Sequence, residues 1–209
     1  MYLHNASNAK QLNSSVPGKK ARMGFSGTDE VKILFVGNVG SGKTAAVNAI
    51  SEIPVLGTET KATEQDALRR KPSTTVAMEY GQVNMHNTKV HVYGSPGQRR
   101  FDFMASILCQ GAAGMMVLID NGCHDPMEEL DYFLNIHGEF LKMNPAIIAV
   151  THYDDIQTDT GLIDYHQYCK KYGFNLPIIR LDAREKHQVS QGVSKLLSAV
   201  LKRKELAIA

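Results

Sequence analysis

Short apolar runs alternate with amphipathic stretches along most of this chain. Glycine, proline or polar residues bound the apolar runs, which is typical of buried strands. These runs predict six strands, at 31–37, 74–84, 88–93, 112–120, 146–151 and 176–181. Between them, apolar residues recur at intervals of three and four and predict helices at 43–53, 125–143, 160–172 and 189–204, with another on a face formed by Phe101, Phe103, Met104 and Leu108. We therefore expect an α/β fold of three layers, with helices on both faces of a mainly parallel sheet.

The second and third predicted strands are separated by the dipeptide His86-Asn87. A connection this short joins antiparallel neighbours, so we expect a hairpin here. One edge strand of the six-stranded sheet would then run against the others, which large sheets tolerate.

A G-x-x-x-x-G-K-T pattern, from Gly37 to Thr44, lies between the first strand and the first helix. It predicts the phosphate-binding loop of a P-loop NTPase. Glycines let backbone N–H groups wrap a phosphate, Lys43 adds a charge for the β- and γ-phosphates, and the Thr44 hydroxyl is suited to ligate Mg²⁺. The alternative is an ordinary glycine-rich turn, but the strand before and the helix after it favour the phosphate loop. We expect nucleotide contacts from Asn38, Val39, Gly40, Ser41, Gly42, Lys43, Thr44 and Ala45.

Composition narrows the class of protein further. A chain of 209 residues with 43% hydrophobic and 21% charged residues is typical of one globular domain, which we expect at 30–209 after a disordered polar leader at 1–29. The net charge of +2 does not favour nucleic acid binding. No apolar run reaches the length of about 18 residues that suggests a membrane span. Widely spaced cysteines indicate reduced thiols and a cytoplasmic protein. Basic residues of the leader leave peripheral membrane contact as the alternative to a solvated arm.

Four segments after the phosphate loop carry a family resemblance: Thr75 before a strand, Tyr93–Gln98 (YGSPGQ), Thr151–Asp154 (THYD) and Asp182–Arg184 (DAR). With these motifs, the chain resembles the Ras-like small GTPases over residues 31 to about 205. Within that superfamily it is most similar to a bacterial branch related to the gliding-polarity and ADP-ribosylation-factor-like GTPases. In that branch the second switch reads Tyr-Gly-Thr/Ser-Pro-Gly-Gln.

The resemblance implies a role for each of these segments. Thr75 would join Thr44 as a Mg²⁺ ligand, with Thr74 as its near rival and an ordinary strand residue as the alternative. Gly97 would offer its N–H to the γ-phosphate, and Gln98 would orient the attacking water, with Lys43 as the second catalytic group. The guanine base would be bound by Thr151, His152, Asp154, Ala183 and Arg184. Asp154 would accept hydrogen bonds from guanine N1–H and the 2-amino group, although a capping or loop aspartate is the alternative.

Two positions depart from the family pattern. The usual aspartate of the second switch is Gly94, which puts tight Mg²⁺ binding in doubt, and the usual lysine of the base motif is His152. Histidine is shorter and mostly neutral at pH 7, so we expect moderate nucleotide affinity.

The resemblance implies a GTP/GDP switch that hydrolyses GTP slowly with Mg²⁺. Switch loops near 54–75 and 94–104 would signal to a GTPase-activating or effector protein, with roadblock-type regulators as the kind the branch suggests. Two alternatives stay open. One is a scaffold that binds GTP or GDP without significant hydrolysis. The other is a P-loop ATPase or kinase in which Asp120 is the acidic group near the metal.

Overall fold

The structure, a computed structural model, describes residues 29–57, 78–153 and 161–208. The leader, most of the first predicted switch loop with Thr74 and Thr75, and Asp154 lie outside the described residues. What was predicted for them therefore stays a prediction.

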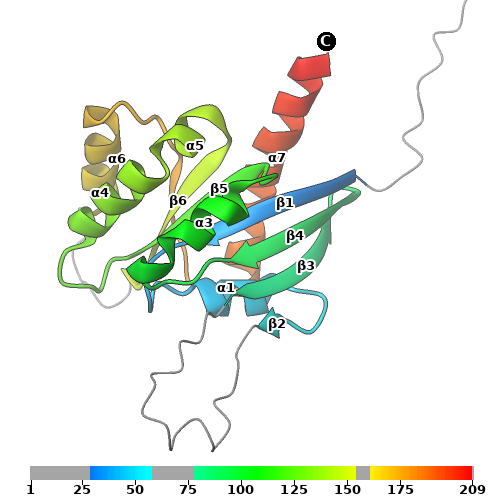
Figure 1. The fold of residues 1–209 in the computed structure, drawn as a ribbon, viewed down its shortest axis with the longest axis horizontal. Helices are drawn as coiled ribbons and strands as arrows, with labels where there is room; N and C mark the ends of the chain where they lie inside the picture. The colour runs from blue at the N-terminus through cyan, green and yellow to red at the C-terminus, as the bar shows by residue number, and fades with distance from the viewer. Residues whose placement is uncertain (1–28, 58–77, 154–160, 209) are drawn as a thin grey trace, which may run out of the picture.

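One sheet forms the centre of the fold, in the order β2-β3-β4-β1-β5-β6-β7. Strands β1, β4, β5, β6 and β7 are mutually parallel, whereas β3 runs antiparallel to both β4 and β2. The α/β fold with its antiparallel hairpin at one side is thereby confirmed (Figure 1). The strands are β1 (Asp29–Val36), β2 (Leu56–Gly57), β3 (Glu79–Met85), β4 (Thr88–Gly94), β5 (Gly114–Asp120), β6 (Ala146–Thr151) and β7 (Ile178–Arg180).

Helices cover both faces of the sheet, because β1 alternates its buried side chains between them. Ile33 and Phe35 pack in a core with α1 (Lys43–Ile50) and α7 (Lys186–Ile208). Leu34 and Val36 pack in a second core on the opposite face of the sheet (Figure 1). The helices on that face are those that follow η1 (Arg99–Phe101) and precede β7 in the chain. Those helices are α3 (Asp102–Cys109), α4 (Pro126–Ile136), α5 (Gly138–Met143) and α6 (Gly161–Lys171). Two apolar cores on opposite faces hold the strand ends, and hence the loops that follow them, in fixed relative positions.

The described residues contain one more strand than predicted. β2 is only two residues long, too short for an alternating pattern to reveal it, and it covers one end of β3. Segment 125–143 forms two helices instead of one. They meet at His137, whose buried ring stacks on the Phe133 ring with 6.1 Å between the ring centroids. The next residue, Gly138, has a weak helix preference. The predicted helix faces also need correction, because Phe103 in α3 and Ile163 in α6 are exposed.

The outer edge of β3 is bonded to the chain that follows α1. Glu52 N–H donates to the Gln82 carbonyl at 2.7 Å, and Ser51 Oγ accepts from Gln82 N–H at 3.3 Å. Glu52 Oε2 also accepts from Asn84 N–H at 3.1 Å. Non-strand residues therefore complete the edge that β2 is too short to cover.

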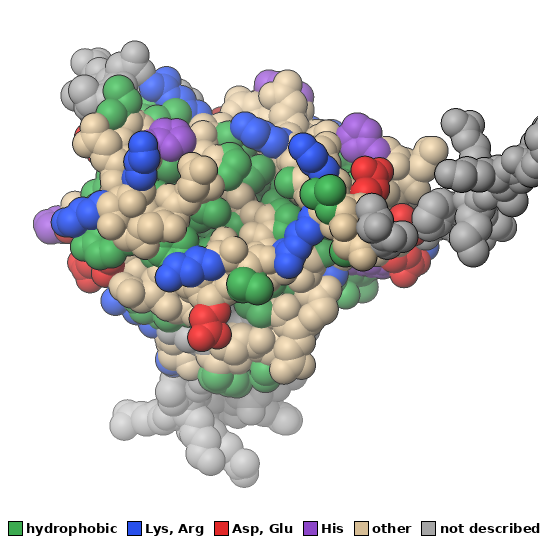
Figure 2. Space-filling view, turned by 90° about the horizontal axis from the view of Figure 1, so that it is seen from above, with side chains coloured by type: hydrophobic (Ala, Val, Ile, Leu, Met, Phe, Trp, Pro, Cys, Tyr) green, Lys and Arg blue, Asp and Glu red, His purple; other side chains and the backbone are tan. Residues whose placement is uncertain are grey.

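Two further properties concern the length of the helices and the charge on one face of the surface. In the described part of the chain, no helix has both the length and the apolar character needed to cross a membrane. On the face shown in Figure 2, lysine and arginine side chains are spread among hydrophobic and uncharged ones and do not form one basic patch.

Candidate functional site

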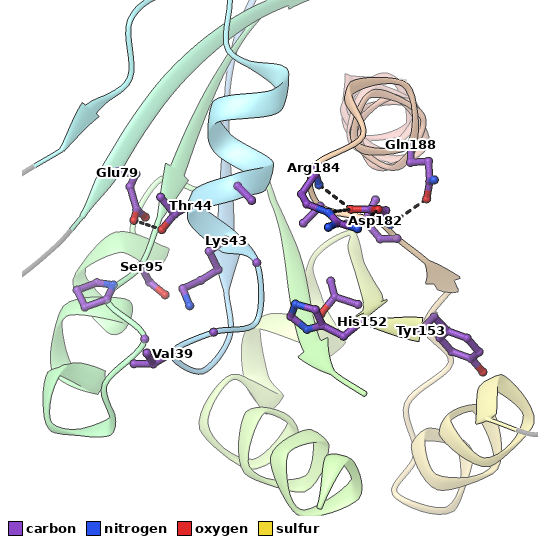
Figure 3. Close-up of a pocket in the computed structure, with 18 of the residues that line it drawn as sticks. Val39, Lys43, Thr44, Glu79, Ser95, His152, Tyr153, Asp182, Arg184 and Gln188 are labelled. Atoms are coloured by element: carbon purple, nitrogen blue, oxygen red, sulfur yellow. Dashed lines mark hydrogen bonds and ion pairs between the residues drawn. The ribbon is translucent and has the colours of Figure 1, made fainter. Parts of the chain in front are cut away.

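A cavity of about 750 Å³ opens where β1, β4, β6 and β7 end. The loops after these strands line it together with the start of α1 (Figure 3). Because parallel strands end at one edge of the sheet, segments far apart in sequence meet here. The sequence-predicted residues among its lining are Val39, Gly40, Gly42, Lys43, Thr44, Ala45, Gly97, Gln98, Thr151, His152, Ala183 and Arg184. Asn38 and Ser41 belong to the same loop but do not line the cavity.

The phosphate loop has the backbone geometry that only glycine adopts easily. Gly40 has a φ of 89° and Gly42 a φ of 93°. A Cβ on Gly42 would also lie 2.7 Å from the Ala183 side chain, so the loop and the segment after β7 are in close contact. Helix α1 begins after Gly42 without a side-chain cap, which leaves its first N–H groups directed at the cavity end.

Lys43 is buried and its ammonium group is held by the loop itself. Nζ donates to the carbonyls of Gly37 at 2.8 Å and Asn38 at 2.7 Å. Burial lowers the pKa of Lys43 to about 8, and the nearby carboxylates of Glu79 and Glu129 oppose that shift. The hydrogen-bond partners of Lys43, these two carbonyls and the Ser41 hydroxyl at 3.4 Å, carry no formal charge, so an anion in the loop would be favoured beside this buried cation.

Glu129 of α4 supports the loop from beneath, a role that the sequence pattern did not reveal. Its Oε1 accepts from Asn38 N–H at 3.3 Å, and its Oε2 accepts from Cys123 Sγ at 3.5 Å. Glu129 is only 3% exposed, and this burial raises its pKa. The only sequence signal for this role of Glu129 was a charged residue at a helix position where the apolar pattern expects a core residue.

The turn after β4 lies directly on the phosphate loop. The Gly97 carbonyl accepts from Val39 N–H at 3.2 Å, and a Cβ on Gly97 would lie 2.8 Å from Lys43 Nζ. The carbonyl of Gly97 is therefore bonded to the phosphate loop in this structure. The Gln98 side chain lines the cavity, and its Oε1 accepts from Arg100 Nε at 2.8 Å.

The end of β6 is tied to the phosphate loop by Thr151. This buried residue has its Oγ1 3.1 Å from the carbonyl oxygens of both Ser41 and Ile119. His152 follows with a φ of 52°, and its Nδ1 lies 2.8 Å from Asp120 Oδ1. The same carboxylate oxygen of Asp120 also accepts from Gly122 N–H at 2.9 Å, whereas the Thr44 hydroxyl bonds to a different carboxylate.

The segment after β7 is fixed by Asp182. Its carboxylate binds the Arg184 guanidinium at 2.8 Å, and this partner lowers the pKa of Asp182 to about 2. Asp182 N–H donates to Gln188 Oε1 at 2.9 Å, and Arg184 N–H donates to Asp182 Oδ1 at 2.9 Å. Among the described residues, no hydrogen bond partner is found for the N–H of Ala183, which lies between these two and lines the cavity.

A carboxylate that the sequence analysis missed lies on the opposite wall. Glu79, the first residue of β3, accepts a hydrogen bond through Oε1 from the Thr44 hydroxyl (Figure 3). Its Oε2 is buried and has no hydrogen bond partner in the described part of the molecule. Those residues contain no group of three or more His, Cys, Asp or Glu side chains that could hold a metal. A cation here would need ligands from a bound phosphate as well.

The fold and this cavity define a P-loop NTPase with a nucleotide-binding site. A family model described as "conserved hypothetical ATP binding protein" matches residues 35–203, and the chain belongs to this family. It is also 32% identical over 175 residues to the uncharacterized protein MJ1339 of Methanocaldococcus jannaschii, covering 81% of this chain and 97% of that one.

Among solved structures, the chain is similar to the bacterial selenocysteine-specific elongation factor EF-Sec. The TM-score is 0.58 with 17% identity over 81% of this chain. At this identity the likeness concerns the fold alone, and the chain spans only 29% of the length of that factor. The comparisons support a P-loop fold and nucleotide binding, and they leave the base and the Ras-like bacterial branch to be proposed.

Proposed function

We propose that this protein is a guanine-nucleotide-binding switch that slowly hydrolyses GTP to GDP and phosphate. The observation that carries the proposal is the composition of the cavity. It joins the phosphate loop, the Gly97–Gln98 turn and the two segments 151–153 and 182–184 around one space. The proposed phosphate, reaction and base subsites therefore border one cavity.

The residues present fit a Mg²⁺ nucleoside triphosphate. The uncapped start of α1 and the Lys43 ammonium favour the phosphates, and the Thr44 hydroxyl and the buried Glu79 oxygen are hard oxygen donors of the kind Mg²⁺ prefers. Thr75 is proposed as the other Mg²⁺ ligand of the chain. When bound, Mg²⁺ would neutralise charge that develops on the phosphates.

Recognition of guanine is assigned to the segments after β6 and β7. Thr151 bonds the first of them to the Ser41 carbonyl of the phosphate loop, which supports placing the base beside the phosphates. In this proposal Asp154 accepts from N1–H and the 2-amino group, the N–H of Ala183 donates to O6, and His152 packs beside the ring. Adenine has no such pair of donors on that edge, so Asp154 would discriminate against it.

Hydrolysis would depend on positioning. Gln98 is proposed to orient water while Lys43 stabilises the developing charge. Arg99 forms an ion pair with Glu128 at 3.8 Å and lies over the Tyr132 ring at 4.2 Å, which directs it toward α4. With no internal arginine finger the rate would be about 10⁻⁴–10⁻³ s⁻¹. A GTPase-activating or effector protein, of the roadblock type that the family resemblance suggests, would then contact the loops near 54–75 and 94–104.

ATP is the second candidate ligand, because the description of the family names ATP binding. In the form of this reading that uses Asp120 as the acidic group near the metal, the geometry gives less support, since Asp120 Oδ1 is bonded to His152 and Gly122 while the Thr44 hydroxyl bonds to Glu79. A non-hydrolysing scaffold is the third candidate. Single-turnover release of phosphate by the parent and by Gln98→Ala separates it from a switch, because a scaffold releases none over many hours.

The decisive test uses the base. Nucleotide-free protein is titrated with fluorescent GDP and then challenged with GDP, ADP or xanthosine diphosphate. The parent should prefer GDP, and Asp154→Asn should prefer xanthosine diphosphate, because an amide donates to the 2-oxo group of xanthine where the carboxylate accepted from the 2-amino group. Asp155→Asn is the matched control and should keep the preference for GDP. Equal displacement by ADP and GDP would refute guanine specificity.

A further inference from the structure

Strand β4 ends beside the phosphate-loop strand without an acidic side chain. In P-loop NTPases, Mg²⁺ is held by the P-loop Ser or Thr and by an aspartate at the end of a neighbouring strand. Here β4 pairs with β1, and its last residue is the buried Gly94. A nucleotide-bound cation at Thr44 therefore needs its protein carboxylate from elsewhere.

Glu79 occupies the space that a side chain on Gly94 would fill. The two residues are directly paired across the β3–β4 hairpin. A Cβ on Gly94 would collide with Glu79 Oε2 and would lie 3.4 Å from Glu79 Cδ. The glycine at the end of β4 and the glutamate at the start of β3 thus fit one another as a pair.

The partners of Glu79 point to a cation. One carboxylate oxygen accepts from the Thr44 hydroxyl, while the other is buried with no partner among the described residues. A carboxyl oxygen that is removed from water and left unbonded is unfavourable, so a ligand is expected at it. The Lys43 ammonium interacts electrostatically with the Glu79 carboxylate, but its hydrogen bonds go to the Gly37 and Asn38 carbonyls and not to Glu79.

We propose that Glu79 is the carboxylate of the Mg²⁺ site, acting with Thr44 in place of an acidic residue at Gly94. The inference rests on nucleotide binding in the proposed function, whichever base is bound. It explains how a chain with glycine at the end of β4 keeps Mg²⁺ at its phosphate loop. The competing explanation is that Glu79 only ties β3 to α1 through Thr44.

The test measures the Mg²⁺ affinity of the protein–nucleotide complex by titrating fluorescent-GDP release with Mg²⁺, and by Mn²⁺ electron paramagnetic resonance. Glu79→Gln keeps the size and the acceptor for Thr44 but removes the charge. We expect it to weaken metal affinity by about 10- to 100-fold. GDP affinity in EDTA should stay within about threefold of the parent. Glu52→Gln, which removes another carboxylate bonded to β3, is the matched control and should behave as the parent.

Equal Mg²⁺ dependence in Glu79→Gln and the parent would overturn the inference while leaving the proposed function intact. Failure of the parent to bind nucleotide would overturn both. If Glu79→Gln does not fold, the exchanged pair provides the answer. Gly94→Asp alone should lose metal affinity by clashing with Glu79, whereas Glu79→Gly with Gly94→Asp should regain it. No recovery in a folded double variant would count against the inference.

Discussion

Adding one methyl group to Gly97 tests how the turn after β4 communicates with the phosphate loop. In Gly97→Ala the new Cβ would lie 2.7 Å from Val39 N, 2.8 Å from Asn38 C and 2.8 Å from Lys43 Nζ. Two of these neighbours are backbone atoms of a loop fixed by glycines, so the turn itself must move. The variant should therefore disfavour the docked turn and its Val39–Gly97 hydrogen bond.

The size of the effect follows from overpacking, which costs about 1–3 kcal/mol when the surroundings are well packed. That range corresponds to a factor of about 5–150 in an equilibrium constant. The Val39 amide should exchange its hydrogen faster by up to this factor. If the γ-phosphate is sensed at Gly97, the ratio of affinities for a non-hydrolysable GTP analogue and GDP should fall by a similar factor, with GDP affinity itself changed by less than about threefold.

Hydrogen exchange read at Val39 and titration with both nucleotides provide the two measurements. Gly57→Ala is the control, because nothing lies within 4 Å of the Cβ it would add. Unchanged Val39 exchange together with an unchanged affinity ratio in Gly97→Ala would refute the coupling between this turn and the loop.

Four further outcomes follow from buried groups. The pKa of Lys43 in the free protein is about 8, and a bound phosphate favours the ammonium form. Above pH 8 nucleotide binding should therefore take up a proton, and nucleotide affinity should fall about tenfold per pH unit. Calorimetry in buffers of different ionisation enthalpy measures this, and binding without proton uptake would contradict it. Between pH 8 and 10.5 the same group makes the free protein more stable as pH rises, because the unfolded chain binds the proton more tightly. The Glu129 carboxylate raises the pKa of Lys43, so its removal in Glu129→Gln should lower that pKa. Nucleotide affinity should then begin to fall at a lower pH, and a fall that begins at a higher pH would argue against this. Tyr165→Phe removes a buried hydrogen bond of 3.0 Å to Asn121 and should lower the free energy of unfolding by about 1–3 kcal/mol in urea titrations, whereas no change would show that water replaces the hydroxyl.

Much of the fold could be predicted because its signals are local. The run Val31–Val36 and the glycines after it predict a buried strand and a phosphate loop, and His86-Asn87 marks the hairpin. Both of these turn residues do adopt positive φ values, of 50° and 58°. Consistency between local pattern and final fold is what makes such segments readable.

Long-range relations could not be predicted in the same way. Glu79 reads as a polar position in an alternating strand, and only the β3–β4 register brings it onto Gly94. Glu129 reads as a charged helix residue, and only the packing of α4 under the phosphate loop brings it to Asn38 N–H. The roles of Thr75 and Asp154 stay predictions, since both lie outside the described residues.

The edges of the sheet bear on how the protein behaves at high concentration. An exposed strand edge recruits another chain and begins aggregation. Here Ser51 and Glu52 occupy the hydrogen-bonding groups of Gln82 and Asn84 on one side, and β7 on the other side is only three residues long. Neither described edge offers a long template for a neighbouring molecule, so crowded copies of this protein should resist edge-to-edge association.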